Sequence, residues 1–378
     1  MSKKIRTALS AFLCAILIMS LLVGCDFSTL FSNKTPNFEA LVDFVIQAED
    51  GREFRILQIT DTQIIDPGQS RYPERIGSTD PLADEDLYRD CFYYIEEAVK
   101  QAQPDLIIMT GDIVYGEFDD NGTSLQKVVA FMESLEIPWA PVFGNHDNES
   151  TKGVTWQCQQ FEEAEHCLFK RGETIGNSNY SIGIVQGNKM IKVIYMLDSN
   201  GCGNGKSYSY MPSFGKYNQD EKLTTAATIG RDTMDWVEAT SKNIFATLGY
   251  SPSKFAAFHI PIEEFGKAIT SIGYMESENF TISDPNGVNF GNKREGLSAM
   301  TVPGFWALMK GNNFDGIFVG HKHCNNFSIV YQGVRLTFGT KSSTYDRNER
   351  DMLGGTLITV AEGGQSFTVA HCLVEKLP

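Results

Sequence analysis

The sequence predicts an α/β protein with a largely parallel sheet, and three observations support this. Short apolar runs alternate with amphipathic helical patterns between residues 54 and 143. Several runs end abruptly in a carboxylate, amide or imidazole residue, as buried central strands do at the edge of a sheet. The same arrangement returns between residues 180 and 323 without a repeat in sequence. Because right-handed crossovers place parallel strand ends on one side, polar side chains are expected to gather at one edge.

The first half is predicted to alternate strand, helix, strand, helix, strand. Tyr88, Phe92, Ile95 and Val99 recur at helical spacing and stop before Pro104, which predicts an amphipathic helix. The predicted strands are 54–60, 106–110 and 139–143, and the predicted helices are 84–103 and 123–136.

The second half is predicted to add strands to the same architecture. Apolar runs predict strands at 180–185, 190–197, 254–258 and 315–319, with a helix at 231–248. The final segments, 327–331, 334–338, 355–360 and 367–374, alternate in the manner of antiparallel strands.

The strand ends carry the candidate functional residues. They are Asp61, Asp112, Asn145 with His146, His259, and His321 with His323. Four of the six histidines directly follow apolar strands, which indicates a ligand set. Oxygen and imidazole donors suit zinc, manganese or iron, and the two oxygens of one carboxylate can bridge two ions. Taken alone, each aspartate could equally cap the turn after its strand.

The ordered motifs resemble the calcineurin-like metallophosphoesterase superfamily, most closely its purple-acid-phosphatase-like branch. The resemblance spans roughly residues 52–345 and rests on the segments RILQITD, TGDIVYG, GNHDNES, IYMLDS, FHIP and FVGHKHCNNF. It implies a four-layer α/β/β/α sandwich with a dinuclear metal site at the strand ends.

The resemblance also implies roles for the strand-end residues. Asp61 and His323 would bind the first metal, Asp112 would bridge, and Asn145, His259 and His321 would bind the second. His146, with Asn145, would contact the substrate and assist catalysis, while a hydroxide bridging the metals would attack phosphorus in line.

One position departs from the common superfamily pattern. The first motif is usually Asp-x-His with both residues on metal, but here it is Asp61-Thr62-Gln63. A neutral amide is a poor substitute for imidazole. Purple acid phosphatases use instead a tyrosine from Gly-Asp-x-x-Tyr, which corresponds to Tyr115. We therefore hypothesise that Tyr115 binds metal as a phenolate, the alternative being an aromatic residue of the pocket.

Other residues near the motifs are weaker candidates. Arg294 and Glu295 are expected either to line the substrate cleft or to form a solvated charge cluster. Asn148 and Glu149 could support the ligands from the outer shell.

The amino terminus predicts export. Three basic residues precede an apolar run from Ala8 to Val23, and Leu22-Val23-Gly24-Cys25 resembles a bacterial lipobox. The predicted organisation is a signal peptide at 1–24, a tether at 25–45 lipidated on Cys25, and a catalytic domain at 46–378. A retained anchor helix is the alternative. In both cases the protein is expected at the extracytoplasmic face of a bacterial cell membrane.

Composition narrows the possible partners. The net charge is −15, and removal of the signal peptide leaves 29 basic against 47 acidic residues, or −18. Nucleic acid binding is therefore not expected, because it requires a basic surface. Beyond Cys14 and Cys25, six cysteines remain. They could form three disulfides or stay single buried thiols.

The predicted function is hydrolysis of phosphate monoesters with two metal ions, iron, zinc or manganese. The alternatives are a phosphodiesterase or nucleotidase of the same fold, and a binding lipoprotein on a degraded metallophosphoesterase scaffold.

Overall fold

The fold is seen in a computed structural model, which describes residues 36–66, 84–116, 119, 121–201 and 226–375. The predicted signal peptide and Cys25 lie outside the described residues. The compact unit begins at Asn37, inside the predicted tether. Phe38, Leu41 and Val42 bury their side chains there, so the residues before position 46 already belong to the fold. Among the described residues, none of the helices has both the length and the apolar character needed to cross a bilayer.

A five-stranded sheet carries the first three motifs. Its order is β14-β13-β2-β3-β4. β2 runs parallel to β3 and β3 to β4, as predicted, whereas β13 is antiparallel to β2 and to β14. The strands are β2 (Phe54–Ile59), β3 (Leu106–Thr110), β4 (Trp139–Val142), β13 (Gly354–Val360) and β14 (Phe367–Leu373).

A seven-stranded sheet carries the remaining motifs. Its order is β1-β5-β6-β7-β10-β12-β11, and β6, β7, β10 and β12 are mutually parallel neighbours. The strands are β1 (Phe44–Ala48), β5 (Tyr180–Gln186), β6 (Lys189–Met196), β7 (Ser253–Ala257), β10 (Phe314–Val319), β11 (Ser328–Tyr331) and β12 (Val334–Phe338). A separate short pair joins β8 (Phe280–Thr281) to β9 (Asn292–Lys293).

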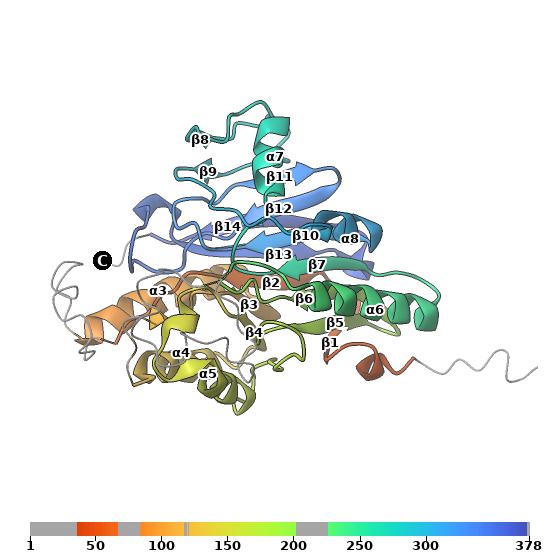
Figure 1. The fold of residues 1–378 in the computed structure, drawn as a ribbon, viewed down its shortest axis with the longest axis horizontal. Coiled ribbons are helices and arrows are strands. Elements are labelled where there is room, and N and C mark those ends of the chain that lie inside the picture. The colour runs from red at the N-terminus through yellow and green to blue at the C-terminus, as the bar shows by residue number, and fades with distance from the viewer. Residues whose placement is uncertain (1–35, 67–83, 117–118, 120, 202–225, 376–378) are drawn as a thin grey trace, which may run out of the picture. The chain divides into compact units, whose positions relative to one another are not determined.

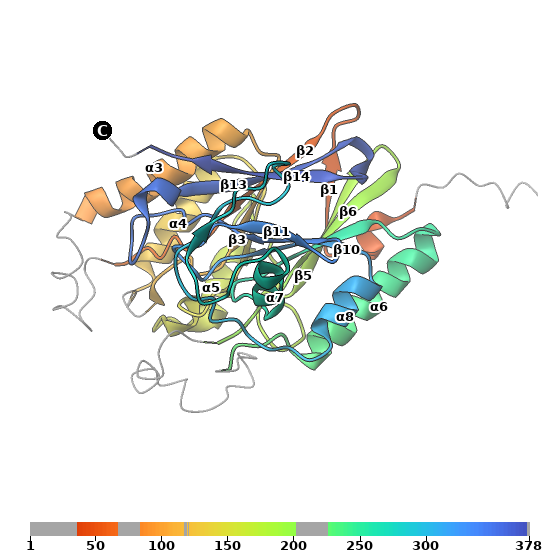
Figure 2. The ribbon, with the colours of Figure 1, turned by 90° about the horizontal axis from the view of Figure 1, so that it is seen from above.

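Helices cover the outer faces of both sheets, which gives the four-layer α/β/β/α sandwich that the family resemblance implies (Figures 1 and 2). The first sheet is covered by α3 (Asp84–Ala102), α4 (Thr123–Ser134) and α5 (Gly153–Glu162). The second is covered by α6 (Arg231–Leu248), α7 (Glu264–Ser271) and α8 (Phe305–Gly311). Short 3-10 turns within the described residues lie at Phe38–Ala40, Asp147–Glu149, Arg350–Met352 and Glu362–Gly364.

The two faces of β6 show why its sequence reads as a continuous apolar run. Ile194 and Met196 belong to the core between the sheets, whereas Val193, Tyr195 and Leu197 belong to the core under the outer helices. Successive strand residues point to opposite faces, and both faces are buried here. The sequence of β6 therefore shows no alternation of apolar and polar residues, although the segment is a strand.

Cysteines stay single in the part of the chain that the structure describes. Cys91, Cys158, Cys167, Cys324 and Cys372 are free and buried, as one of the two sequence-based alternatives predicts. Cys202 lies outside the described residues.

Candidate metal centre

Five strand ends from both sheets deliver the candidate ligands to one place. Asp61 follows β2, Asp112 follows β3 and Asn145 follows β4, all in the five-stranded sheet. His259 follows β7, and His321 with His323 follows β10, in the seven-stranded sheet. The gathering of polar strand ends at one edge is thus observed, and it spans two sheets instead of one.

Three of these ligands lie at backbone positions with positive φ. Asp61, Asp112 and His321 have φ values of 54°, 50° and 75°, a left-handed conformation that side chains other than glycine rarely adopt. A Cβ at Gly144 would overlap Asp112 Oδ1. One at Gly320 would overlap Thr60 Oγ1. Glycines before the ligands therefore permit the close approach of neighbouring strand ends.

The ligands form two groups that share one carboxylate. Donor atoms of Asp61, Asp112 and His323 lie within 4.8 Å of one another, and so do those of Asp112, His259 and His321. This is the division between two ions that the family resemblance implies, with Asp112 common to both.

Buried atoms without partners test whether metal ions fit here. Within the described residues, Asn145 Oδ1 and His259 Nε2 are buried and have no hydrogen-bond partner. Buried polar atoms are normally satisfied, so two such atoms in one site are consistent with a cation as their partner. The donors are oxygens and imidazole nitrogens, a set that suits zinc, manganese or iron. The residues present therefore fit a pair of such ions.

Backbone carbonyls orient two of the imidazoles. His259 Nδ1 lies 2.8 Å from Thr110 O, and His323 Nδ1 lies 3.0 Å from Arg347 O. Because a carbonyl only accepts, each Nδ1 must carry the proton and donate it. Nε2 of His259 then faces Asp112 Oδ2 at 3.1 Å, and Nε2 of His323 faces Asp61 Oδ1 at 3.3 Å.

Charge is concentrated around Asp112. Burial would raise the pKa of its carboxyl, but the charges of His259 and His146 hold that pKa well below its usual range. Asp112 Oδ1 also accepts a hydrogen bond from the backbone N–H of His146 at 2.8 Å. The shared carboxylate is thus held in its anionic form, and its Oδ1 is fixed by a backbone hydrogen bond.

His146 is paired with a buried carboxylate. Its Nδ1 lies 2.7 Å from Glu149 Oε2, and the Glu149 side chain is only 1% exposed. Burial lowers the pKa of His146, but the charges of Asp112 and Glu149 and the hydrogen bond to Glu149 raise it to about 10. His146 is therefore arranged as a proton donor beside the shared ligand. The outer-shell role considered for Glu149 is in fact a direct contact with His146.

Tyr115 packs against this histidine. The two rings stack with centroids 4.2 Å apart. The structure thus places Tyr115 beside the centre, and its binding to metal stays a hypothesis.

Gln63 has a partner that the sequence did not suggest. Its Nε2 lies 3.4 Å from Asp112 Oδ2, and its Oε1 accepts a hydrogen bond from Lys341 Nζ at 2.9 Å. Lys341 is 1% exposed and follows β12, within Gly339-Thr340-Lys341-Ser342-Ser343. Lys341 could have been found as a candidate by the pattern that identified the other site residues, which is a polar residue shortly after an apolar strand.

Arg294 is engaged elsewhere than expected for a substrate ligand. Its guanidinium donates to Asp351 Oδ1 and Oδ2 at 2.8 and 2.7 Å, and to Glu349 Oε2 at 3.0 Å. This arrangement is the charge cluster, one of the two possibilities that the sequence left open for Arg294. Glu295 accepts a hydrogen bond from Cys324 N, and Asn148 donates one to Gly201 O.

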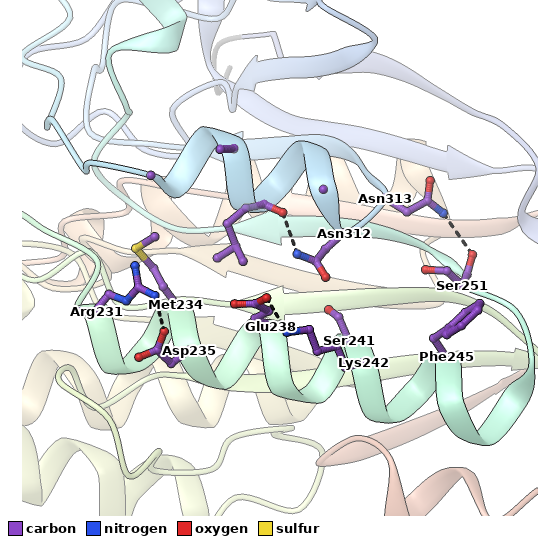
Figure 3. Close-up of a pocket in the computed structure, with 14 residues that line it drawn as sticks. Arg231, Met234, Asp235, Glu238, Ser241, Lys242, Phe245, Ser251, Asn312 and Asn313 are labelled. Carbon is purple, nitrogen blue, oxygen red and sulfur yellow. Dashed lines mark hydrogen bonds and ion pairs between the residues drawn. The ribbon is translucent and has the colours of Figure 1, made fainter.

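A groove of ≈ 700 Å³ lies elsewhere, between α6 and α8 (Figure 3). It contains none of the strand-end residues. Arg231 pairs with Asp235 at 2.8 Å, and Lys242 pairs with Glu238 at 2.6 Å, so these charges are already satisfied. The functional site is therefore located by its candidate ligands and not by this groove.

Comparison with known proteins shows what the chain is similar to. The model of the calcineurin-like phosphoesterase family matches residues 54–325. A relative from Arabidopsis thaliana, called probable inactive purple acid phosphatase 29, is 27% identical over 76% of this chain and 71% of its own length. Phosphatase DCR2 of Saccharomyces cerevisiae is 25% identical over 75% of this chain and 46% of its own length.

Solved structures resemble the chain more distantly. A dimetal phosphatase from Danio rerio has a TM-score of 0.44 at 10% identity, covering 84% of this chain and 98% of its own. Purple acid phosphatase PPD1 from yellow lupin has a TM-score of 0.39 at 12% identity, covering 85% of this chain and 52% of its own.

Proposed function

This chain belongs to the calcineurin-like phosphoesterase family, whose general chemistry is metal-dependent hydrolysis of phosphoesters, and we propose that it acts as a phosphomonoesterase. The observation that carries the proposal is the pair of ligand groups sharing Asp112, with the backbone N–H of His146 hydrogen-bonded to that same carboxylate. A shared carboxylate suits two ions held close together, and a proton donor beside it suits the release of an ester oxygen.

Each group of residues has a defined task in the proposed reaction. Asp61 and His323 would hold one ion, Asn145, His259 and His321 the other, and Asp112 both. When bound, two such ions neutralise phosphate charge and make a water molecule nucleophilic. As water adds to phosphorus, the bond to the ester oxygen breaks. His146 would protonate that oxygen, while Glu149 keeps the imidazole charged and oriented.

One specific observation favours a second candidate. Two relatives from Arabidopsis thaliana are called probable inactive purple acid phosphatases 29 and 14. A binding lipoprotein on the same scaffold therefore remains the rival function. Such a binding protein is expected to carry fewer metal ions than the enzyme, because a degraded first motif at Asp61-Thr62-Gln63 would hold no ion.

Metal removal is the test of the proposed function. We expect the purified full chain to carry two equivalents of iron, zinc or manganese and to release phosphate from p-nitrophenyl phosphate. Prolonged chelation should remove both ions and reduce turnover at least about 100-fold, and metal addition should restore it. Elemental analysis and a phosphate assay measure both quantities.

The same preparation separates the alternatives. At most one equivalent of metal without turnover would favour the binding protein. Cleavage of bis-p-nitrophenyl phosphate or nucleotides, with the monoester untouched, would replace the monoesterase by a phosphodiesterase or nucleotidase.

Iron loading tests the role of Tyr115. A visible charge-transfer band that disappears in Tyr115→Phe would establish a phenolate ligand. An active, colourless enzyme insensitive to Tyr115→Phe would exclude it.

We also propose that the chain is exported and anchored by lipid on Cys25, on the strength of the lipobox-like residues 22–25. Cys25→Ser should move the protein from the detergent phase of a Triton X-114 extract to the aqueous phase. Unchanged partition of this variant, with residues 1–24 still attached, would favour the retained anchor helix.

A further inference from the structure

The orientation of the Gln63 amide is determined by its neighbour Lys341. Lys341 Nζ lies 2.9 Å from one end of the amide and 2.7 Å from the backbone oxygen of Asp61. An ammonium group only donates hydrogen bonds, so the amide atom facing it is the oxygen. The two ends of a glutamine amide are usually assigned by such networks, and this network leaves one assignment. The amide nitrogen therefore faces the metal centre.

The amide nitrogen points at the carboxylate that both ligand groups share. Gln63 Nε2 lies 3.4 Å from Asp112 Oδ2, the oxygen that His259 Nε2 also faces at 3.1 Å. Amide nitrogen donates hydrogen bonds and has no lone pair to offer an ion. Gln63 is 0% exposed, so bulk solvent does not reach this contact.

From this geometry we infer that Gln63 is a positioning residue, which Lys341 locks in place so that its N–H holds the shared carboxylate of Asp112. In this arrangement the amide is not a metal ligand in place of histidine. Lys341, Gln63 and Asp112 form a chain from ammonium to amide to carboxylate. The inference rests on the proposed two-metal function and specifies how its first position is completed.

The surroundings of Lys341 support a fixed role. Burial of an ammonium is unfavourable unless it is hydrogen-bonded and near opposite charge. Lys341 donates hydrogen bonds to two neutral oxygens, and the negative charges of Asp61 and Asp112 attract its ammonium group. Ser342 and Ser343, the next residues, bind the backbone of Thr60 and Thr62. The loop after β12 is therefore tied to the first motif on both sides of Asp61.

Binding of Mn²⁺ to the full-length apoprotein, followed by calorimetry and electron paramagnetic resonance, tests the inference without any turnover. Gln63→Leu removes the donor and should weaken the weaker of two Mn²⁺ sites roughly 10- to 100-fold, the range for outer-shell groups. Gln63→His should change that Kd by less than about 3-fold, because the ring can accept from Lys341 and donate to Asp112. In a Lys341→Met background, the additional loss from Gln63→Leu should shrink to less than about 3-fold, because the two residues act as one unit.

Matched controls come from the far end of the sandwich. Gln186 is a buried glutamine bound to the backbone of Glu49 and Arg52, and Lys254 is a buried lysine bound to Ser251 and Pro252. Gln186→Leu and Lys254→Met should leave both Mn²⁺ affinities unchanged. Circular dichroism confirms that each variant is folded.

Three outcomes would overturn the inference. Tightening of at least 10-fold in Gln63→His would show that position 63 faces the ion as a ligand. If Gln63→Leu binds Mn²⁺ as the wild type does, and the wild type holds two ions, then Gln63 only occupies space. The proposed function would be unaffected by that result. A wild type that binds fewer than two ions would remove the proposed function together with this inference.

Discussion

Asp112→Asn is expected to reduce phosphate release at least about 1,000-fold, or about 4 kcal/mol of transition-state stabilisation. Asp112 belongs to both ligand groups, so its loss affects both ions at once. Asparagine keeps the shape but replaces one carboxylate oxygen by an NH₂ group, which cannot bind a cation. It also removes the negative charge that His259 and His146 face. Metal content should fall from two equivalents to one or fewer.

The control for this variant is another aspartate that ends a strand. Asp198 follows β6, is 0% exposed, and accepts hydrogen bonds from the backbone of Asn177 and Asn200. Asp198→Asn should cost stability, about 1 to 3 kcal/mol, because buried N–H groups lose an acceptor. It should keep both metal ions and most of its turnover. Equal metal loss in the two variants would mean that Asp112 acts through the fold and not as a shared ligand.

The comparison of Asp112 with Asp198 also shows what the sequence could predict. Both aspartates end buried apolar strands, and periodicity alone does not distinguish them. The family resemblance does, because it assigns a metal-ligand role to Asp112 and none to Asp198, although the segment IYMLDS around Asp198 also resembles the family. The strands, the main helices and the convergence of their polar ends were therefore predictable from local pattern.

Partners far apart in sequence were not predictable in this way. Lys341 meets Gln63 across 278 residues, and Arg294 meets Glu349 and Asp351 across 55 and 57. No periodicity encodes such pairs, since they depend on how distant segments of the chain pack together. The start of the compact unit at Asn37 was not predictable for a similar reason. Phe38, Leu41 and Val42 are too few to form a pattern, and their burial depends on residues such as Val185 and Met190 of the second sheet.

His146→Ala is expected to lower kcat for an alkyl phosphate such as glycerol phosphate about 100- to 10,000-fold, the range for a general acid. An alkoxide is a poor leaving group and needs the proton that the imidazole supplies. The loss for p-nitrophenyl phosphate should be much smaller, because p-nitrophenolate leaves without protonation. Metal content should be unchanged. His166, which is paired with Glu133 at 3.2 Å, provides the matched control: His166→Ala should affect neither substrate.

The pH dependence separates proton donation from simple charge stabilisation by His146. The charges of Asp112 and Glu149 raise the pKa of His146 against the opposing effect of burial. Glu149→Gln keeps the side-chain shape but removes one of these charges, so the pKa of His146 must fall. A general acid works only while protonated, and the alkaline limb of kcat/KM for the alkyl ester should therefore move to lower pH in this variant. The limb for p-nitrophenyl phosphate should move less, because its release does not need the proton. Equal shifts for both esters would mean that His146 acts on the phosphoryl group, which both substrates share, and not on the leaving oxygen.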